Sequence, residues 1–144
     1  MADVVKIEDE HVSELAQALV LAYGENPWNE IWTMEQARKS ILYTISGSGS
    51  RGYAVLEDGK AVGALMGKIQ LYRDYEFFIN QIYVHPAFQG RGLARKMLSH
   101  AAAALSREGI TGIELITIPY DRGFYEACGY QACDWLCMTH HLKQ

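Results

Sequence analysis

The order of apolar patterns along the chain predicts a mixed α/β fold, in which a mostly antiparallel central sheet is flanked by helices. Two β-rich runs within residues 51–69 are separated only by Asp58-Gly59, the strongest short-range signal for a β-hairpin. Farther on, the strand-like residues 75–84 lead through a glycine-containing loop and an amphipathic helix into a strand-like run at residues 112–118. A strand, a helix and a second strand in this order form a parallel crossover, so we expect a mixed sheet.

Length and composition suit one domain spanning residues 1–144. Of the 144 residues, 49% are hydrophobic, and no repeat or low-complexity tract divides the chain. No signal-type segment opens the sequence and its apolar runs are too short to span a bilayer, so we expect a soluble, cytoplasmic protein without a membrane partner. The formal net charge of −4 provides no broad positive field, so we expect no nucleic-acid partner.

The first third of the chain is predicted to form one strand and two helices. Residues 3–7 indicate a strand, and Asp9 is the expected N-cap of a helix over residues 10–23. Residues 33–36, Thr-Met-Glu-Gln, have the form of a capping box and predict a second helix to about residue 45. The side chains expected to face the core are Val12, Leu15, Ala16, Leu19 and Ala22 in the first helix, and Ala37, Ile41, Leu42 and Ile45 in the second.

The rest of the chain continues the alternation. We expect strands at residues 51–57, 60–69 and 75–84, a long helix ending near residues 107–109, a strand at residues 112–118, a short helix at residues 121–128, and one or two closing strands within residues 130–142. Pro119 ends the strand before it, and Gly129 suits a left-handed position after the short helix.

The junction after residue 84 is suited to bind an anion. It joins a strand to a helix start, where main-chain amides lack partners and the helix dipole is positive. Gly90 and Gly92 leave the backbone uncovered, and Arg91 and Arg95 add positive charge, so we interpret the loop as a pyrophosphate cradle. Its spacing matches neither the dinucleotide fingerprint nor the nucleotide P-loop.

Three motifs in this part of the chain resemble the GNAT family of N-acetyltransferases, and they occur in the family's order. Residues 89–94, Gln-Gly-Arg-Gly-Leu-Ala, fit its Q/R-x-x-G-x-G/A signature. They follow Ile-Tyr-Val-His-Pro at residues 82–86 and precede Gly-Phe-Tyr-Glu-Ala-Cys-Gly-Tyr at residues 123–130. The resemblance covers residues 51–130 well and the first fifty residues in outline.

The resemblance implies acetyl-CoA as acetyl donor, bound where the two central parallel strands splay apart. Its pyrophosphate would rest on amides of the glycine loop, and its pantetheine arm on main-chain groups of Ile82 and Val84; these two residues are otherwise explained as buried sheet core. The cofactor-binding residues expected from the resemblance are Ile82, Tyr83, Val84, Gln89, Gly90, Arg91, Gly92, Leu93, Ala94 and Arg95.

The implied chemistry is direct transfer of the acetyl group to an amine. Tyr125 stands where the family's F-Y-x-x-x-G-F motif places a tyrosine that protonates the departing thiolate, and the alternative is that Tyr125 only packs under the CoA. The motif ends here in Tyr130 instead of phenylalanine, and Ile118 replaces an asparagine frequent in the family. The general base is left open between a water held by Asn80 or Gln81 and an amine that arrives neutral.

For the acceptor, we expect Glu25, Trp28, Trp32 and Asn80 to bind the substrate. Carboxylates beside aromatic faces suit a cationic amine. The alternative is that the tryptophans anchor the core and the glutamates form a solvated rim. The histidines show no metal-ligand spacing with carboxylates, so we expect no metal.

Two function classes therefore remain open. One is an acetyl-CoA-dependent N-acetyltransferase, with a small cationic amine slightly favoured as acceptor, and the other is a non-catalytic acyl-CoA-binding sensor or interaction domain of the same fold. Homodimers are frequent in the family, and residues 130–142 could add across such an interface.

Overall fold

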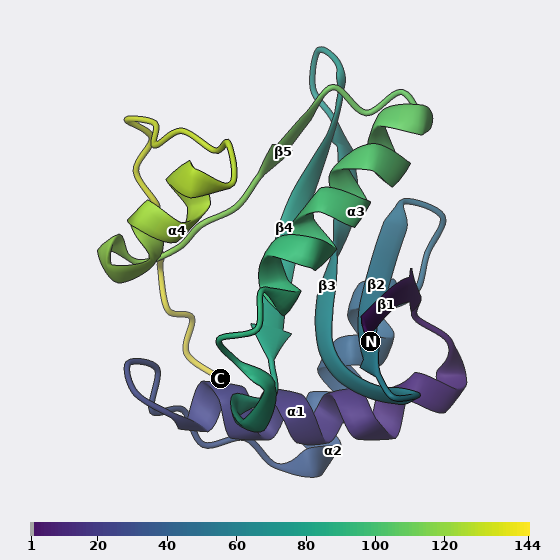
Figure 1. Ribbon diagram of the computed structural model, residues 1–144. Helices are drawn as coiled ribbons and strands as arrows, with labels where there is room; N and C mark the ends of the chain where they lie inside the picture. Colours follow the sequence, from purple (N-terminus) through teal and green to yellow (C-terminus); the bar gives the residue numbers. More distant parts are fainter. Residues whose placement is uncertain (1) are drawn as a thin grey trace.

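The computed structural model describes residues 2–144 and contains one five-stranded sheet in the order β1-β2-β3-β4-β5 (Figure 1). Every neighbouring pair of strands is antiparallel except β4 and β5, which are parallel. The predicted mixed, mostly antiparallel sheet is therefore confirmed. The strands are β1 (Ala2–Lys6), β2 (Ser50–Glu57), β3 (Lys60–Leu71), β4 (Tyr75–Val84) and β5 (Gly112–Glu114).

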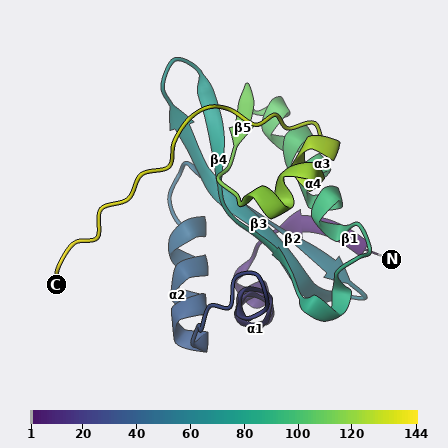
Figure 2. The ribbon, with the colours of Figure 1, turned by 90° about the vertical axis from the view of Figure 1, so that its left-hand side faces the viewer.

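Helices cover both faces of the sheet (Figure 2). Helices α1 (Val12–Gly24) and α2 (Met34–Ile45) lie on one face, and α3 (Leu93–Arg107) lies on the other. The short α4 (Arg122–Ala127) follows β5, and 3₁₀ turns occur at Asp9–His11, Pro86–Phe88 and Pro119–Asp121. Among residues 2–144, no helix is both long and apolar enough to cross a bilayer.

Two cores result because side chains alternate between the faces of each strand. The core under α1 and α2 includes Leu15, Leu19, Ile41, Ala64 and Met66, and the core under α3 includes Val55, Leu65, Phe77, Met97 and Leu105. All ten of these side chains are at most 1% exposed.

Local sequence chemistry explains where several elements begin and end. Asp58 and Gly59 both have positive φ, as the predicted two-residue hairpin between β2 and β3 requires. The capping box of α2 is formed in both directions: the Gln36 N–H donates to Thr33 Oγ1 at 3.0 Å, and the Thr33 N–H donates to Gln36 Oε1 at 2.9 Å.

Two predictions in the first third of the chain were wrong. Asp9 is not an N-cap, because it is the first residue of the 3₁₀ turn Asp9–His11. Glu8 caps this turn, and α1 starts only at Val12. Leu42 is 46% exposed, although it was predicted to face the core. It lies one residue, or about 100° around the helix, from Ile41, which is fully buried.

The C-terminal part departs further from the prediction. Strand β5 ends at Glu114 instead of Ile118, because the chain turns away from β4 after only three paired positions. Residues 130–142 contain no strand, and no strand edge pairs with them in the described chain. The side chains of Trp135, Leu136 and Met138 are about 85% exposed there.

Candidate active site

The parallel strands β4 and β5 pair along only a short stretch and then separate. Their register joins Glu76, Phe77 and Phe78 to residues 112–114 and stops there. Figure 1 shows β5 running on toward α4 while β4 continues toward α1. The second half of β4 therefore has no neighbouring strand on that side.

Main-chain groups of β4 point into this gap. The His85 N–H donates to the carbonyl of Val62 at 2.7 Å, so the main-chain groups of His85 face β3. Because the residues of an antiparallel ladder alternate between facing the partner and facing away, Val84 and Ile82 direct their amides and carbonyls into the gap. The implied role of these two residues thus has a geometric basis.

A cleft of about 380 Å³ opens at the gap. Strand β4 forms one wall, the glycine loop and the start of α3 form the floor, and α4 forms the other wall. Its lining residues are Ile82, Tyr83, Val84, Phe88, Gln89, Gly90, Gly92, Leu93, Ala94, Arg95, Asp121, Phe124 and Tyr125. Of the ten residues expected to bind the donor, nine line the cleft. Arg91 does not line it, and its guanidinium lies over the Phe88 ring, 5.0 Å from the centroid.

The glycine loop leaves room for a ligand at the start of α3. Gly90 and Gly92 have φ of +79° and +77°, and a Cβ added to either would meet no atom within 4 Å. Both positions therefore need glycine for their backbone conformation, and both face open space. Arg95 lies in the first turn of α3, and its Nη2 donates to the carbonyl of Ala127 at 3.2 Å, which connects α3 to α4.

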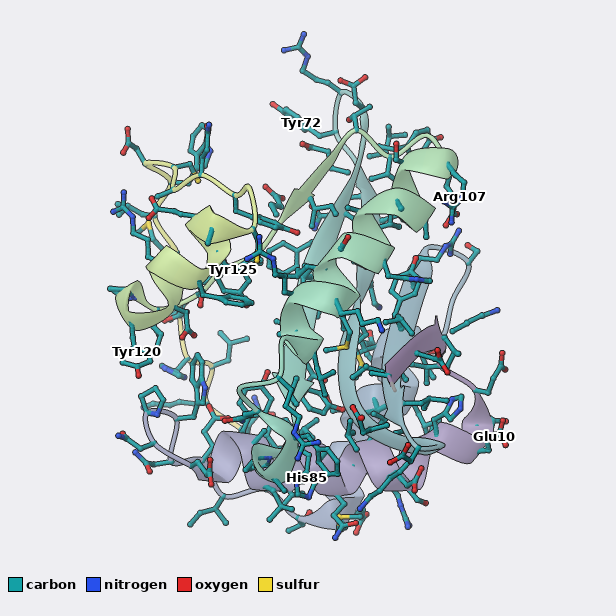
Figure 3. All side chains as sticks on the ribbon, in the orientation of Figure 1. Glu10, Tyr72, His85, Arg107, Tyr120 and Tyr125 are labelled. Carbon is teal, nitrogen blue, oxygen red and sulfur yellow. The ribbon has the colours of Figure 1, made fainter. Side chains whose placement is uncertain are left out.

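Tyr125 projects from α4 toward the cleft (Figure 3). Its ring contacts Phe124 and Tyr130 edge-on, with centroid distances of 5.1 and 5.8 Å. Burial, followed by the nearby Asp121 carboxylate, raises the pKa of the Tyr125 phenol well above its ordinary value near 10. The phenol is therefore a proton donor and not a phenolate at neutral pH.

On the face of the sheet that α1 covers, aromatic side chains gather around Tyr23, the penultimate residue of α1. Its ring lies 5.8 Å from Trp28, 6.3 Å from Trp32 and 5.8 Å from Tyr83, measured between centroids. Its hydroxyl donates to the carbonyl of Ile82 at 3.4 Å, which is a carbonyl of the gap. Burial, then the charge of Glu30, raises the pKa of Tyr23 to about 12.

Comparison with known proteins decides the family. The family model for the acetyltransferase (GNAT) family matches residues 14–130, most of the chain. The chain belongs to the GNAT family. A curated relative, an L-2,4-diaminobutyric acid acetyltransferase of Streptomyces avermitilis, is 32% identical over 80 residues, which are 55% of this chain and 45% of that protein. The match thus spans less than half of that relative's length.

Solved structures share the GNAT fold over nearly the whole chain. A possible acetyltransferase from Clostridium difficile 630 has a TM-score of 0.85 at 12% identity, with 100% of this chain and 99% of that chain covered. An aminoglycoside N-acetyltransferase solved in complex with CoA has a TM-score of 0.78 at 14% identity, with 98% and 95% covered. At these identities the likeness concerns the fold.

Not all of the residues predicted for the acceptor side of this GNAT chain come together. Trp28 and Trp32 meet at Tyr23, and Trp32 Nε1 donates to Glu30 Oε1 at 3.0 Å. Glu25 is exposed and ends α1 through its main chain, with its N–H donating to Ala22 at 3.4 Å. Its side chain has no hydrogen bond among residues 2–144, so the structure does not join it to this cluster.

Asn80 occupies a bulge in β4. Met66 pairs with Gln81 and the next residue, Gly67, pairs with Ile79, so Asn80 is left without a partner in β3 and is exposed. Gln81 turns toward α2, where its Nε2 donates to Ser40 Oγ at 2.9 Å. Its Oε1 is buried and has no partner among the described residues.

Sequence reasoning did not identify Tyr23. Tyr23 ends the apolar stripe of α1 and comes just before the tryptophan-rich loop. This position is the sequence signal that could have pointed to its role. Its contact with Ile82, which lies 59 residues away in the chain, depends on the packing of α1 against β4.

Proposed function

We propose that residues 1–144 form one acetyltransferase domain, which moves an acetyl group from acetyl-CoA to a primary amine by direct attack within a ternary complex. The gap between β4 and β5, which ends at the glycine loop, is the observation that carries this proposal. CoA has an anionic diphosphate and an arm with amide bonds. The first fits the helix start at Gly92, and the second fits the open main-chain groups of Ile82 and Val84.

Main-chain amides and two side chains of the cleft have separate roles in this proposal. Acetyl-CoA would supply an acetyl group activated as a thioester. Amides of the glycine loop hold the diphosphate, Arg95 adds positive charge, and a strand amide near Val84 stabilises the oxyanion. The protonated phenol of Tyr125 donates its proton to the leaving thiolate. Burial raises the pKa of a thiol as well as that of a phenol, so the thiolate that leaves within the cleft is a stronger base than it would be in water.

The acceptor ammonium must lose a proton before it attacks. The buried, unpartnered Oε1 of Gln81 supports a role in holding an ordered water that takes this proton, and the exposed amide of Asn80 is the alternative holder. An Asn80→Ala variant with an unchanged pH–rate profile would remove Asn80 from this role, and the same measurement on Gln81→Ala tests Gln81.

We propose a small cationic amine as the acceptor, bound by Trp28, Trp32 and the neighbouring carboxylates. The stretch from the end of α1 to the first turn of α2 supports this choice. Residues 23–37 include Glu25, Glu30 and Glu35 and no Lys, Arg or His. A negative potential beside aromatic rings favours cations. The matched relative is named for acetylation of a diamino acid, which is consistent with an amine acceptor.

Binding and turnover separate the enzyme from an acyl-CoA-binding sensor. The first experiment is calorimetric titration with acetyl-CoA and desulfo-CoA, with ATP as a control ligand, followed by a panel of amines with product detection by mass. Binding of both CoA compounds together with an acetylated amine supports the enzyme. Binding without turnover on any amine supports the sensor, and absence of binding contradicts both.

The C-terminal segment supports a homodimer as part of the proposal. Residues 131–144 lie beyond the family match, form no helix or strand, and expose Trp135, Leu136 and Met138 to solvent. We propose that they pack on a second copy of the chain, which would bury these side chains. Light scattering tests this: a dimer is expected for the full chain, and a monomer for a variant ending at residue 130.

We place the enzyme in the cytoplasm, where acetyl-CoA is available.

A further inference from the structure

Two side chains hold the carbonyls that β4 directs into the gap. The hydroxyl of Tyr23 donates to the carbonyl of Ile82 at 3.4 Å, and Gln89 Nε2 donates to the carbonyl of Val84 at 3.0 Å. One donor comes from the end of α1 and the other from the start of the glycine loop. Both contacts are partly buried, and both carbonyls lie where no neighbouring strand is paired.

A ligand with amide groups that lies along β4 would use the same acceptors. An extended chain added to an open strand is held by main-chain hydrogen bonds, here to the carbonyls and amides of Ile82 and Val84. This step rests on the proposed function, because the pantetheine arm of acetyl-CoA is the ligand with those amides. The Tyr23 contact lies at the long limit for a hydrogen bond, so it is the weaker of the two and the easier to give up.

Tyr23 also touches the acceptor side of the site. Its ring packs edge-on against Trp28 and tilted against Trp32, and Trp32 in turn holds the Glu30 carboxylate. A change in the position of the Tyr23 hydroxyl therefore moves a ring that supports the acceptor wall. Among the described side chains, Tyr23 is the one that hydrogen-bonds a gap carbonyl and contacts both tryptophans.

We propose that Tyr23 is a positioning residue that couples donor binding to the acceptor wall. Its hydroxyl donates to the Ile82 carbonyl in the free protein, and it gives up this hydrogen bond when the amide arm of the donor bonds to the same carbonyl. The Tyr23 ring then shifts against Trp28 and Trp32, so that the acceptor wall takes its final arrangement only after the donor is bound.

The test uses desulfo-CoA, which carries the arm and the diphosphate but no thiol. The chain has three tryptophans, so Trp135→Phe leaves Trp28 and Trp32 as the only indole reporters. In this background, desulfo-CoA should bind by calorimetry and change the tryptophan emission. Adding Tyr23→Phe should tighten desulfo-CoA binding by about two- to tenfold, because one competing hydrogen bond is lost, and should remove most of the emission change.

The matched control is Tyr53→Phe. Tyr53 is a buried tyrosine under α3 that does not line the cleft, so its variant should keep both the affinity and the emission change of the background. A residue with a purely structural role would lose affinity on truncation, not gain it. Affinity of Tyr23→Phe at or below that of the background, or an emission change that survives in it, overturns the coupling role. Failure of the background protein to bind desulfo-CoA overturns the proposed function instead.

Discussion

The rings of Tyr125 and Tyr130 pack edge-on with centroids 5.8 Å apart, and the Tyr130 N–H donates to the carbonyl of Tyr125 at 3.0 Å. The two residues belong to the end of α4 and the turn after it, where Gly129 adopts a positive φ of 95°. This left-handed residue brings Tyr130 back over the helix. The Tyr130 ring therefore packs against the phenol of Tyr125, which is the proposed acid. Tyr130 stands at the last position of the F-Y-x-x-x-G-F motif, where the family has phenylalanine.

Tyr125→Phe tests that acid. The variant keeps the ring and its packing and removes only the proton donor, so turnover should fall by about a hundredfold or more, while desulfo-CoA affinity stays within about twofold. Steady-state kinetics and calorimetry measure the two quantities. Tyr120→Phe is the matched control, because Tyr120 is 84% exposed in the turn before α4 and should have no effect. Full activity in Tyr125→Phe would leave this residue only a packing role.

The pH dependence gives a second test of the same group. Burial raises the pKa of Tyr125 above its ordinary value near 10, so the acid form persists through the neutral and mildly alkaline range. We expect no fall in kcat between about pH 7 and 9 that depends on Tyr125. A fall with a midpoint in that range that is absent from Tyr125→Phe would contradict the raised pKa.

Gly92→Val tests the cradle. The substitution should abolish desulfo-CoA binding, because the Cβ and its methyl groups fill the open space at the start of α3. It should also cost about 1–2 kcal/mol of unfolding free energy, since φ is +77° at this position. Gly109→Val is the control at the other end of the helix: φ is +87°, so the strain is similar, but the cleft is elsewhere. Comparable destabilisation of both variants with equal loss of binding would show that strain, not obstruction, is responsible.

How much the sequence could predict depended on how local each signal was. The Asp58-Gly59 hairpin, the Thr33–Gln36 capping box and the glycine loop were all found, because each is encoded within a few neighbouring residues. Strands within residues 130–142 were not, because a strand needs a partner edge, and β-like patterning does not say whether the edge exists. The contact between Tyr23 and Ile82 was missed for the same reason, since it depends on tertiary packing.

The Arg51–Glu108 ion pair should make stability depend on pH. It joins β2 to the end of α3, with Arg51 Nη2 and Glu108 Oε1 2.6 Å apart and both side chains about one-third exposed. The hydrogen bond from Arg51 lowers the pKa of Glu108 in the folded protein. The ion pair therefore stabilises the fold fully at pH values above the pKa that Glu108 has in the unfolded chain, and this stabilisation is lost as pH falls through the lower pKa of the folded state. Glu108→Gln should lose at most about 1 kcal/mol at neutral pH in low salt. Urea unfolding should show this difference shrinking as pH falls below the ordinary glutamate pKa of about 4.3; a constant difference would contradict the linkage.

The charge of Glu30 provides the sharpest test of the acceptor proposal. Glu30→Gln keeps an oxygen that can accept the Trp32 N–H but removes the negative charge beside the aromatic wall. The KM for a dication such as 1,4-diaminobutane should therefore rise by about three- to tenfold, whereas the KM for butylamine should rise less, because it has no second charge to lose. Glu35→Gln, in the exposed first turn of α2, is the matched control for the loss of one carboxylate from the same segment. If Glu30→Gln and Glu35→Gln raise both KM values alike, the effect is one of overall potential, and the carboxylate held by Trp32 does not select the acceptor.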